Sequence, residues 1–115
     1  MIWLWLSAAF MATTAVVHGI LGERRLLQPL MTLDQGIMGV ELARKVFRLA
    51  WHALSLLMLV SAASVVWPGT PRELILLIGA TWSATGLFDA IYTRGRHIGW
   101  PFLTASGVFA LLGAA

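Results

Sequence analysis

Residues 1–22 contain no Lys, Arg, Asp or Glu, and residues 49–67 are equally free of charge. At about 1.5 Å of rise per helical residue, the apolar segment 2–21 is long enough to cross a hydrocarbon core of about 30 Å. Charged residues make up only 11% of the chain and hydrophobic residues 59%. A soluble domain of 115 residues cannot bury so much apolar surface. The sequence therefore predicts an integral membrane protein.

The first apolar segment has one competing interpretation, a secretory signal peptide. Such a peptide begins with a basic region, and Met1–Trp5 contains no basic residue. We therefore interpret this segment as a transmembrane helix. The chain has no cysteine, which excludes disulfides and thiolate ligands. Its basic excess, a net charge of +3, indicates membrane topology and not nucleic-acid binding.

Charged and turn-forming residues interrupt the apolar sequence at three places. They are the charged stretch 23–48, the turn Pro68–Pro71 and the basic turn 93–97. We predict an all-α, integral membrane four-helix bundle in one transmembrane domain covering residues 1–115. The expected helices are 2–22, 40–67, 72–92 and 99–115.

Helix ends follow from local residue types. Pro29 is expected to end the first helix, because proline cannot continue one. Asp34 is a candidate N-cap for the second helix. For the third helix we expect Thr70 as N-cap, Pro71 at the first position and Glu73 as the acid of a capping box.

The basic residues predict the orientation of the bundle. Seven of them lie in or beside the two loops that follow the first and third helices, and only Arg72 lies on the other side; the seven are Arg24, Arg25, Arg44, Lys45, Arg48, Arg94 and Arg96. The positive-inside rule then places both loops in the cytoplasm and both termini outside. We expect an N-out/C-out, multi-pass protein of the bacterial inner (plasma) membrane.

Two helix faces stand out. On the second helix a polar stripe recurs at steps of three and four residues: Glu41, Arg44, Lys45, Arg48, His52 and Ser55. For its Arg and Lys residues, a charged helix end that reaches the head groups is the simpler explanation. On the third helix, Gly79, Ser83 and Gly86 favour close packing against a neighbour, and Trp82 is expected to pack in the interior.

All three histidines fall toward the predicted cytoplasmic side. His18 lies one turn before the end of the first helix, His52 lies inside the second, and His97 precedes the fourth. Ionisable groups within a membrane span are costly unless they face the bundle interior or a wet cavity. We therefore predict a cofactor site formed by His18, His52 and His97, with Asp89 added for a metal. The expected supporting polar residues are Glu23, Glu41 and Arg48.

Three imidazoles and a carboxylate suit Zn, Fe, Cu or Mn, and two imidazoles can ligate haem. A histidine and carboxylate chain can also relay protons. No metal-binding spacing such as H-E-x-x-H is present, so the prediction depends on shared depth alone. Each residue also has a structural interpretation. His18 can bond a helix-end carbonyl, His52 can form a structural hydrogen bond, and His97 can anchor at the interface. Asp89 can pair with Arg94, Arg96 or Arg48, and Glu23 and Glu41 can pair with nearby basic residues.

Three segments carry a resemblance to known proteins: HGILGERR at 18–25, FRLAWHALS at 47–55 and GRHIGW at 95–100. They resemble a group of small, uncharacterised bacterial inner-membrane proteins. The resemblance implies a shared four-helix architecture and brings no activity, cofactor or substrate with it.

The sequence leaves several functions open. The first is a histidine-rich site near the cytoplasmic side for a ligand or cofactor, which is a transition metal, haem or a small polar molecule, with or without catalysis. The second is an accessory or structural subunit of a larger membrane complex. The third is a small transporter, although the first helix lacks a central acid. The expected partners are the lipid bilayer and either a second copy or a larger complex, and no nucleic acid.

Overall fold

The computed structural model describes residues 1–115 as an all-helical chain without strands. Its four long helices are α1 (Ile2–Gly22), α3 (Glu41–Val66), α4 (Arg72–Tyr92) and α5 (Trp100–Ala114). The prediction of an all-helical chain of four long helices is confirmed, and each bound lies within one residue of its expected position. Three helical segments are long and apolar enough to cross a membrane, and α5 is shorter, with 15 residues.

The first helical segment does not end before Pro29, contrary to our prediction. It continues through a π-helical turn, η1 (Glu23–Leu27), into α2 (Gln28–Met31), giving 30 helical residues from Ile2 to Met31. In the wider π turn, the Gln28 N–H donates to the carbonyl of Glu23, five residues earlier. Pro29 then lies in the first turn of α2, where proline is tolerated.

Both predicted side-chain caps are wrong. The short 3₁₀ helix η2 (Gly36–Gly39) separates Asp34 from α3, which begins after Val40 without a side-chain cap. Pro71 is the N-cap residue of α4, and its carbonyl accepts from the N–H groups of Leu74 and Ile75. Thr70 therefore lies one residue too early to cap the helix.

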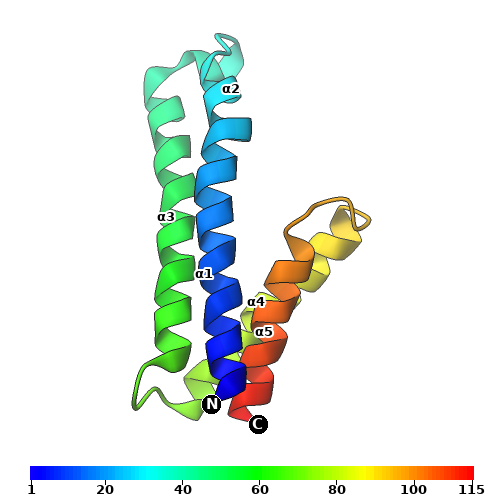
Figure 1. Ribbon diagram of the computed structural model, residues 1–115. Helices are drawn as coiled ribbons and strands as arrows, with labels where there is room; N and C mark the ends of the chain where they lie inside the picture. Colours follow the sequence, from blue (N-terminus) through cyan, green and yellow to red (C-terminus); the bar gives the residue numbers. More distant parts are fainter.

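The helices are arranged in the spatial order α3, α1, α5, α4. Helix α1 packs along α3 on one side and against α5 on the other, and α4 packs against α5, while α3 and α4 touch little. Figure 1 shows the two termini at the same end of the bundle, where the α3–α4 turn also lies. Away from that end, the hairpin of α4 and α5 diverges from the pair of α1 and α3 (Figure 1).

Small residues allow α4 and α5 to approach closely. A Cβ atom added to Gly107 would lie 2.5 Å from the carbonyl oxygen of Gly79, and one added to Gly86 would lie 2.5 Å from the backbone N of Thr104. The predicted close packing along Gly79, Ser83 and Gly86 is therefore confirmed. Because backbone atoms form these contacts, no side-chain movement could make room for a larger residue.

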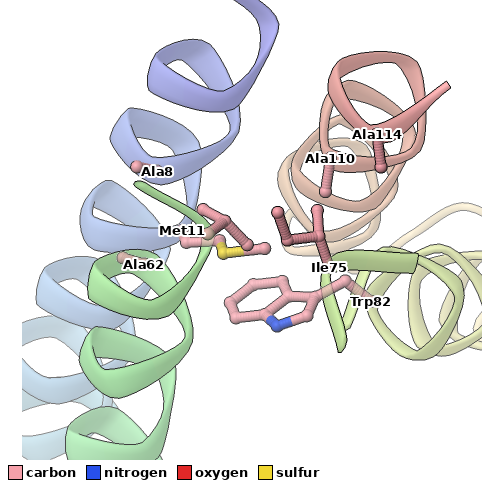
Figure 2. Packing of buried hydrophobic residues seen from close by; sticks show 8 residues of the cluster. Ala8, Met11, Ala62, Ile75, Trp82, Ala110 and Ala114 are labelled. Atoms are coloured by element: carbon pink, nitrogen blue, oxygen red, sulfur yellow. The ribbon is translucent and has the colours of Figure 1, made fainter. Parts of the chain in front are cut away.

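The hydrophobic core lies between two helical hairpins, α1 with α3 and α4 with α5. Met11 and Trp82 point into it from α1 and α4 (Figure 2). The other members are smaller or aliphatic: Ala8, Ala62, Val65, Ile75, Ala110 and Ala114. Trp82 is 8% exposed, which confirms its packing role. A buried hydrogen bond of 2.6 Å from Ser7 Oγ to the carbonyl of Ser106 ties α1 to α5.

Most of the apolar surface is not buried within the chain. Only 16 of the 115 residues are buried, and large apolar side chains such as Leu56, Leu77 and Phe88 are more than half exposed. Soluble monomers rarely expose contiguous apolar surface on this scale. The longest dimension of the molecule, 50 Å, is also comparable to the thickness of a bilayer with its head groups, about 40–45 Å. Both features are compatible with a membrane protein.

Candidate functional site

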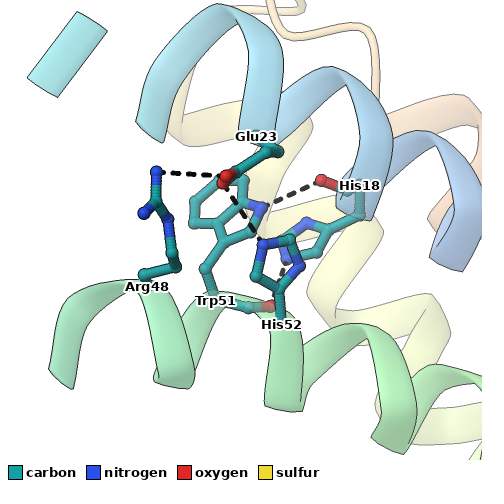
Figure 3. A network of polar contacts seen from close by, with 5 residues as sticks. All are labelled: His18, Glu23, Arg48, Trp51 and His52. Atoms are coloured by element: carbon teal, nitrogen blue, oxygen red, sulfur yellow. Dashed lines mark hydrogen bonds and ion pairs between the residues drawn. The ribbon is translucent and has the colours of Figure 1, made fainter. Parts of the chain in front are cut away.

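His18 and Trp51 form a reciprocal contact between α1 and α3. The Trp51 indole N–H donates to the carbonyl of His18 at 2.9 Å, and His18 Nε2 donates to the carbonyl of Trp51 at 3.1 Å. The two rings stack with centroids 4.2 Å apart and planes inclined by 8°. Figure 3 shows both rings between the helices. Because Nε2 is engaged, Nδ1 is the ring nitrogen of neutral His18 that can still accept a hydrogen bond.

Two glycines of α1 make this approach possible. A Cβ atom on Gly22 would lie 2.2 Å from Nε1 of Trp51, so the indole occupies the space that a side chain would need. At Gly19 the nearest atom to such a Cβ is Ser55 Oγ, at 3.3 Å. Gly22 is therefore the position at which α1 must lack a side chain for Trp51 to reach the His18 carbonyl.

Glu23 forms a second polar group beside the first. Its two carboxylate oxygens contact Arg48 Nη2 at 3.1 Å and His52 Nε2 at 3.3 Å (Figure 3). Glu41 pairs with Lys45 at 2.9 Å on the exposed face of α3. The prediction that both glutamates pair with nearby basic residues is confirmed. Arg48 and His52 of the polar stripe on α3 therefore contact the first helical segment through Glu23, which lies in the π turn.

His97 is held by Asp89 across the turn between α4 and α5. His97 Nδ1 donates to Asp89 Oδ2 at 2.6 Å, and the Asp89 side chain is 17% exposed. The predicted pairing of Asp89 with an arginine is wrong, because the tight turn brings His97 back over the last turn of α4. A Cβ on Gly99 would lie 2.7 Å from Cε1 of His97, so this glycine leaves room for the ring. The bond to Asp89 places a proton on Nδ1 and leaves Nε2 without a protein partner.

A groove of about 440 Å³ lies where the two hairpins diverge. We call it the histidine groove, because His18 and His97 both line it. One wall belongs to the first helical segment: Thr14, Val17, His18, Leu21, Gly22, Arg25 and Leu26. The facing residues come from α3 and from the α4–α5 turn with α5: Trp51, Met58, His97, Ile98, Gly99 and Leu103.

The structure brings together only some of the predicted site residues. His18 and His97 both line the histidine groove. Asp89 does not line it and is hydrogen-bonded to His97. His52 lies instead in the contact with Glu23. Glu41 and Arg48 line a separate hollow of about 420 Å³ near the N-terminal end of α3. No three or more His, Asp or Glu side chains are placed to hold one metal ion.

Sequence reasoning did not select Arg25 or Trp51 as site residues. Arg25 follows His18 by seven positions, a helical spacing that places both on one face. That spacing was a usable signal for Arg25. For Trp51 there was no signal, because its role depends on the missing side chain of Gly22 on another helix.

No protein family, curated protein or solved structure matches this chain. The resemblance to small bacterial inner-membrane proteins stays a prediction. What the chain does must therefore be inferred from the histidine groove and its surroundings.

Proposed function

We propose that the protein is a multi-pass, N-out/C-out protein of the bacterial inner membrane that binds a ligand in the histidine groove, on the cytoplasmic side. The observation that carries the proposal is the convergence of His18 and His97 on one groove from helices far apart in the sequence. The excess of basic residues in the loops beside this groove supports its cytoplasmic placement.

The groove has the size and chemistry of a small-molecule site. Ligand pockets commonly measure about 300–1,000 Å³ and combine apolar walls with a few placed polar groups. Here the volume is about 440 Å³, and His97 Nε2 and His18 Nδ1 have no protein partner. Asp89 and the Trp51 carbonyl hold the two rings in place, so the polar groups are preorganised.

Among the ligands that the sequence leaves open, we propose an organic molecule. A metal site usually needs three or four protein ligands, and the groove offers two imidazoles. Two imidazoles are the number that haem ligation uses, so haem is a distinct outcome of the test below.

The test is native mass spectrometry of the full chain released from mild detergent, with haem and metal content measured on the same sample. We expect a small organic molecule to stay bound to the wild-type protein. The variant Val17→Trp fills the groove and should lose this mass. Val16→Trp is the matched control, because Val16 is 53% exposed and does not line the groove.

Two results would overturn the proposal. One is a wild-type protein that carries neither an organic molecule nor a cofactor; co-purification of a stable protein partner would then favour an accessory subunit. The other is equal loss of the bound mass in both valine variants, which would show that the molecule does not occupy the groove.

A further inference from the structure

The charges around the histidine groove have one sign. Its lining includes Arg25, His18 and His97 and no acidic residue. Asp89, the nearest carboxylate to His97, is already occupied by the bond to Nδ1. Arg25 makes no ion pair within the chain. A groove that is lined by an unpaired arginine and by no acidic residue attracts an anion.

The remaining walls of the groove are mainly apolar. They include Val17, Leu21, Leu26, Met58, Ile98 and Leu103. Arg25 lies beyond His18 along the helical segment, away from the termini, whereas Met58 and Leu103 lie toward the hydrophobic core, against which both of them pack. The groove is therefore polar at one end and apolar at the other, which matches an amphipathic ligand.

A second hollow extends the apolar end. It measures about 250 Å³, lies between α3 and α4, and shares Met58 and Leu103 with the histidine groove. Its other lining residues include Leu54 and Leu57. Because α3 and α4 touch little, this hollow opens between them on the side that would face lipid. The two hollows are adjacent at Met58 and Leu103, so movement of these two side chains would join them into a path for a hydrocarbon chain.

We infer that the ligand of the histidine groove is an anionic phospholipid. Its phosphate contacts Arg25 and His97, and one acyl chain runs past Leu21 to Met58 and Leu103, entering from the membrane between α3 and α4. This inference rests on the proposed function and names the ligand class of the same groove.

The chemistry of the two basic groups suits a phosphate. Arginine donates two parallel hydrogen bonds to phosphate oxygens, a geometry that lysine cannot supply. When the His97 ring carries both protons, Nδ1–H donates to Asp89 and Nε2–H is free to donate to the phosphate. Basic pockets between transmembrane helices on the cytoplasmic side are a recurrent binding mode for anionic lipids.

The experiment is a lipid titration of the full chain in mild detergent, followed by native mass spectrometry. Phosphatidylglycerol and phosphatidylcholine with the same acyl chains are compared. Both lipids carry the phosphate, but the ammonium of the choline head group cancels its charge and is repelled by Arg25, so we expect the wild-type protein to prefer phosphatidylglycerol by about tenfold. Arg25→Gln and His97→Asn should each remove most of this preference. Arg24→Gln is the matched control, because Arg24 is an exposed neighbour that does not line the groove.

Three outcomes would overturn the inference while leaving the proposed function intact, provided that Val17→Trp still displaces a bound molecule. They are equal binding of the two lipids, equal loss in the Arg24 and Arg25 variants, and full displacement of the lipid by millimolar inorganic phosphate. The last would show that a free anion is sufficient. If the wild-type protein retains no molecule at all, the proposed function and the inference both fail. Circular dichroism and elution volume verify that each variant is folded.

Discussion

At the scale of single residues, Trp51 links the architecture to the histidine groove. Its indole N–H donates to the His18 carbonyl, which satisfies the polar end of this half-buried side chain, and its ring stacks on the imidazole. The Trp51 carbonyl also accepts a hydrogen bond from His18 Nε2, and this bond fixes the imidazole ring. The geometry of this wall therefore depends on Gly22, where the indole occupies the space that a side chain would need.

We predict that Gly22→Ala destabilises the protein by about 1–2 kcal/mol. Overpacking typically costs about 1–3 kcal/mol, and the better helix propensity of alanine returns up to about 1 kcal/mol. The measurement is thermal unfolding in mild detergent, followed by circular dichroism. Gly19→Ala is the control, because its Cβ would meet only the Ser55 hydroxyl at 3.3 Å, and its effect should be within about 0.5 kcal/mol. If the two variants are equally stable, Trp51 is not held as described.

At the scale of elements, the π turn η1 and the hairpin of α4 and α5 determine where the groove lies. The π turn itself contains Glu23, which meets α3, and Arg25, which lines the groove, and the helical segment continues from it past Pro29. In the hairpin, glycine contacts lock α4 and α5 into one unit. That unit holds both Asp89 and His97, so their bond is internal to the hairpin and does not depend on α1.

The locking of the hairpin can be tested at Gly107. We predict that Gly107→Ala costs about 2–3 kcal/mol, because its Cβ would meet the backbone of both Ser83 and Gly79 within 2.5 Å and neither can yield. Gly113→Ala is the comparison on the same helix. There the two closest atoms belong to the Leu4 side chain, which can rotate away, and the nearest backbone atom, Leu4 N, lies at 3.1 Å, so the cost should be smaller, about 1 kcal/mol. Thermal unfolding in detergent ranks the two variants, and the reverse ranking would contradict this description of the interface.

At the scale of the whole molecule, the histidine groove exists because the two hairpins converge at the end with the termini and diverge at the other (Figure 1). The buried bond from Ser7 to the Ser106 carbonyl and the core around Met11 hold the converging end. At the diverging end, no comparable core fills the space between α1 and the turn that carries His97. A ligand that occupies this space would therefore bridge the hairpins.

The proposed N-out/C-out orientation predicts a labelling pattern. The chain has no cysteine, so single-cysteine variants can be labelled without background from the protein. We expect a membrane-impermeant maleimide to label Thr70→Cys, in the α3–α4 turn, on intact cells. Gln35→Cys, in the exposed loop before α3, should react only after the cells are permeabilised. The opposite pattern would place the histidine groove on the outer side.

The sequence by itself determined the helices, because charge-free segments and turn residues are local signals. It also anticipated the pairing of Glu41 with Lys45, which are one helical turn apart, and the close packing at Gly79 and Gly86. The expectation that the first helix ends before Pro29 was wrong, because the π turn before the proline changes which backbone N–H groups need hydrogen-bond partners.

Only the tertiary structure decided how the ionisable residues are distributed. Hydropathy sets the depth of His18, His52 and His97 along the bundle, but it does not set the rotation of a helix or its neighbours. The structure separates His52, which meets Glu23, from His18 and His97, which share the groove. It also places Arg25 beside them and orders the helices so that α3 and α4 touch little. These features arise from contacts between different helices, above all at Gly22 and Gly107, where a missing side chain lets one helix approach another.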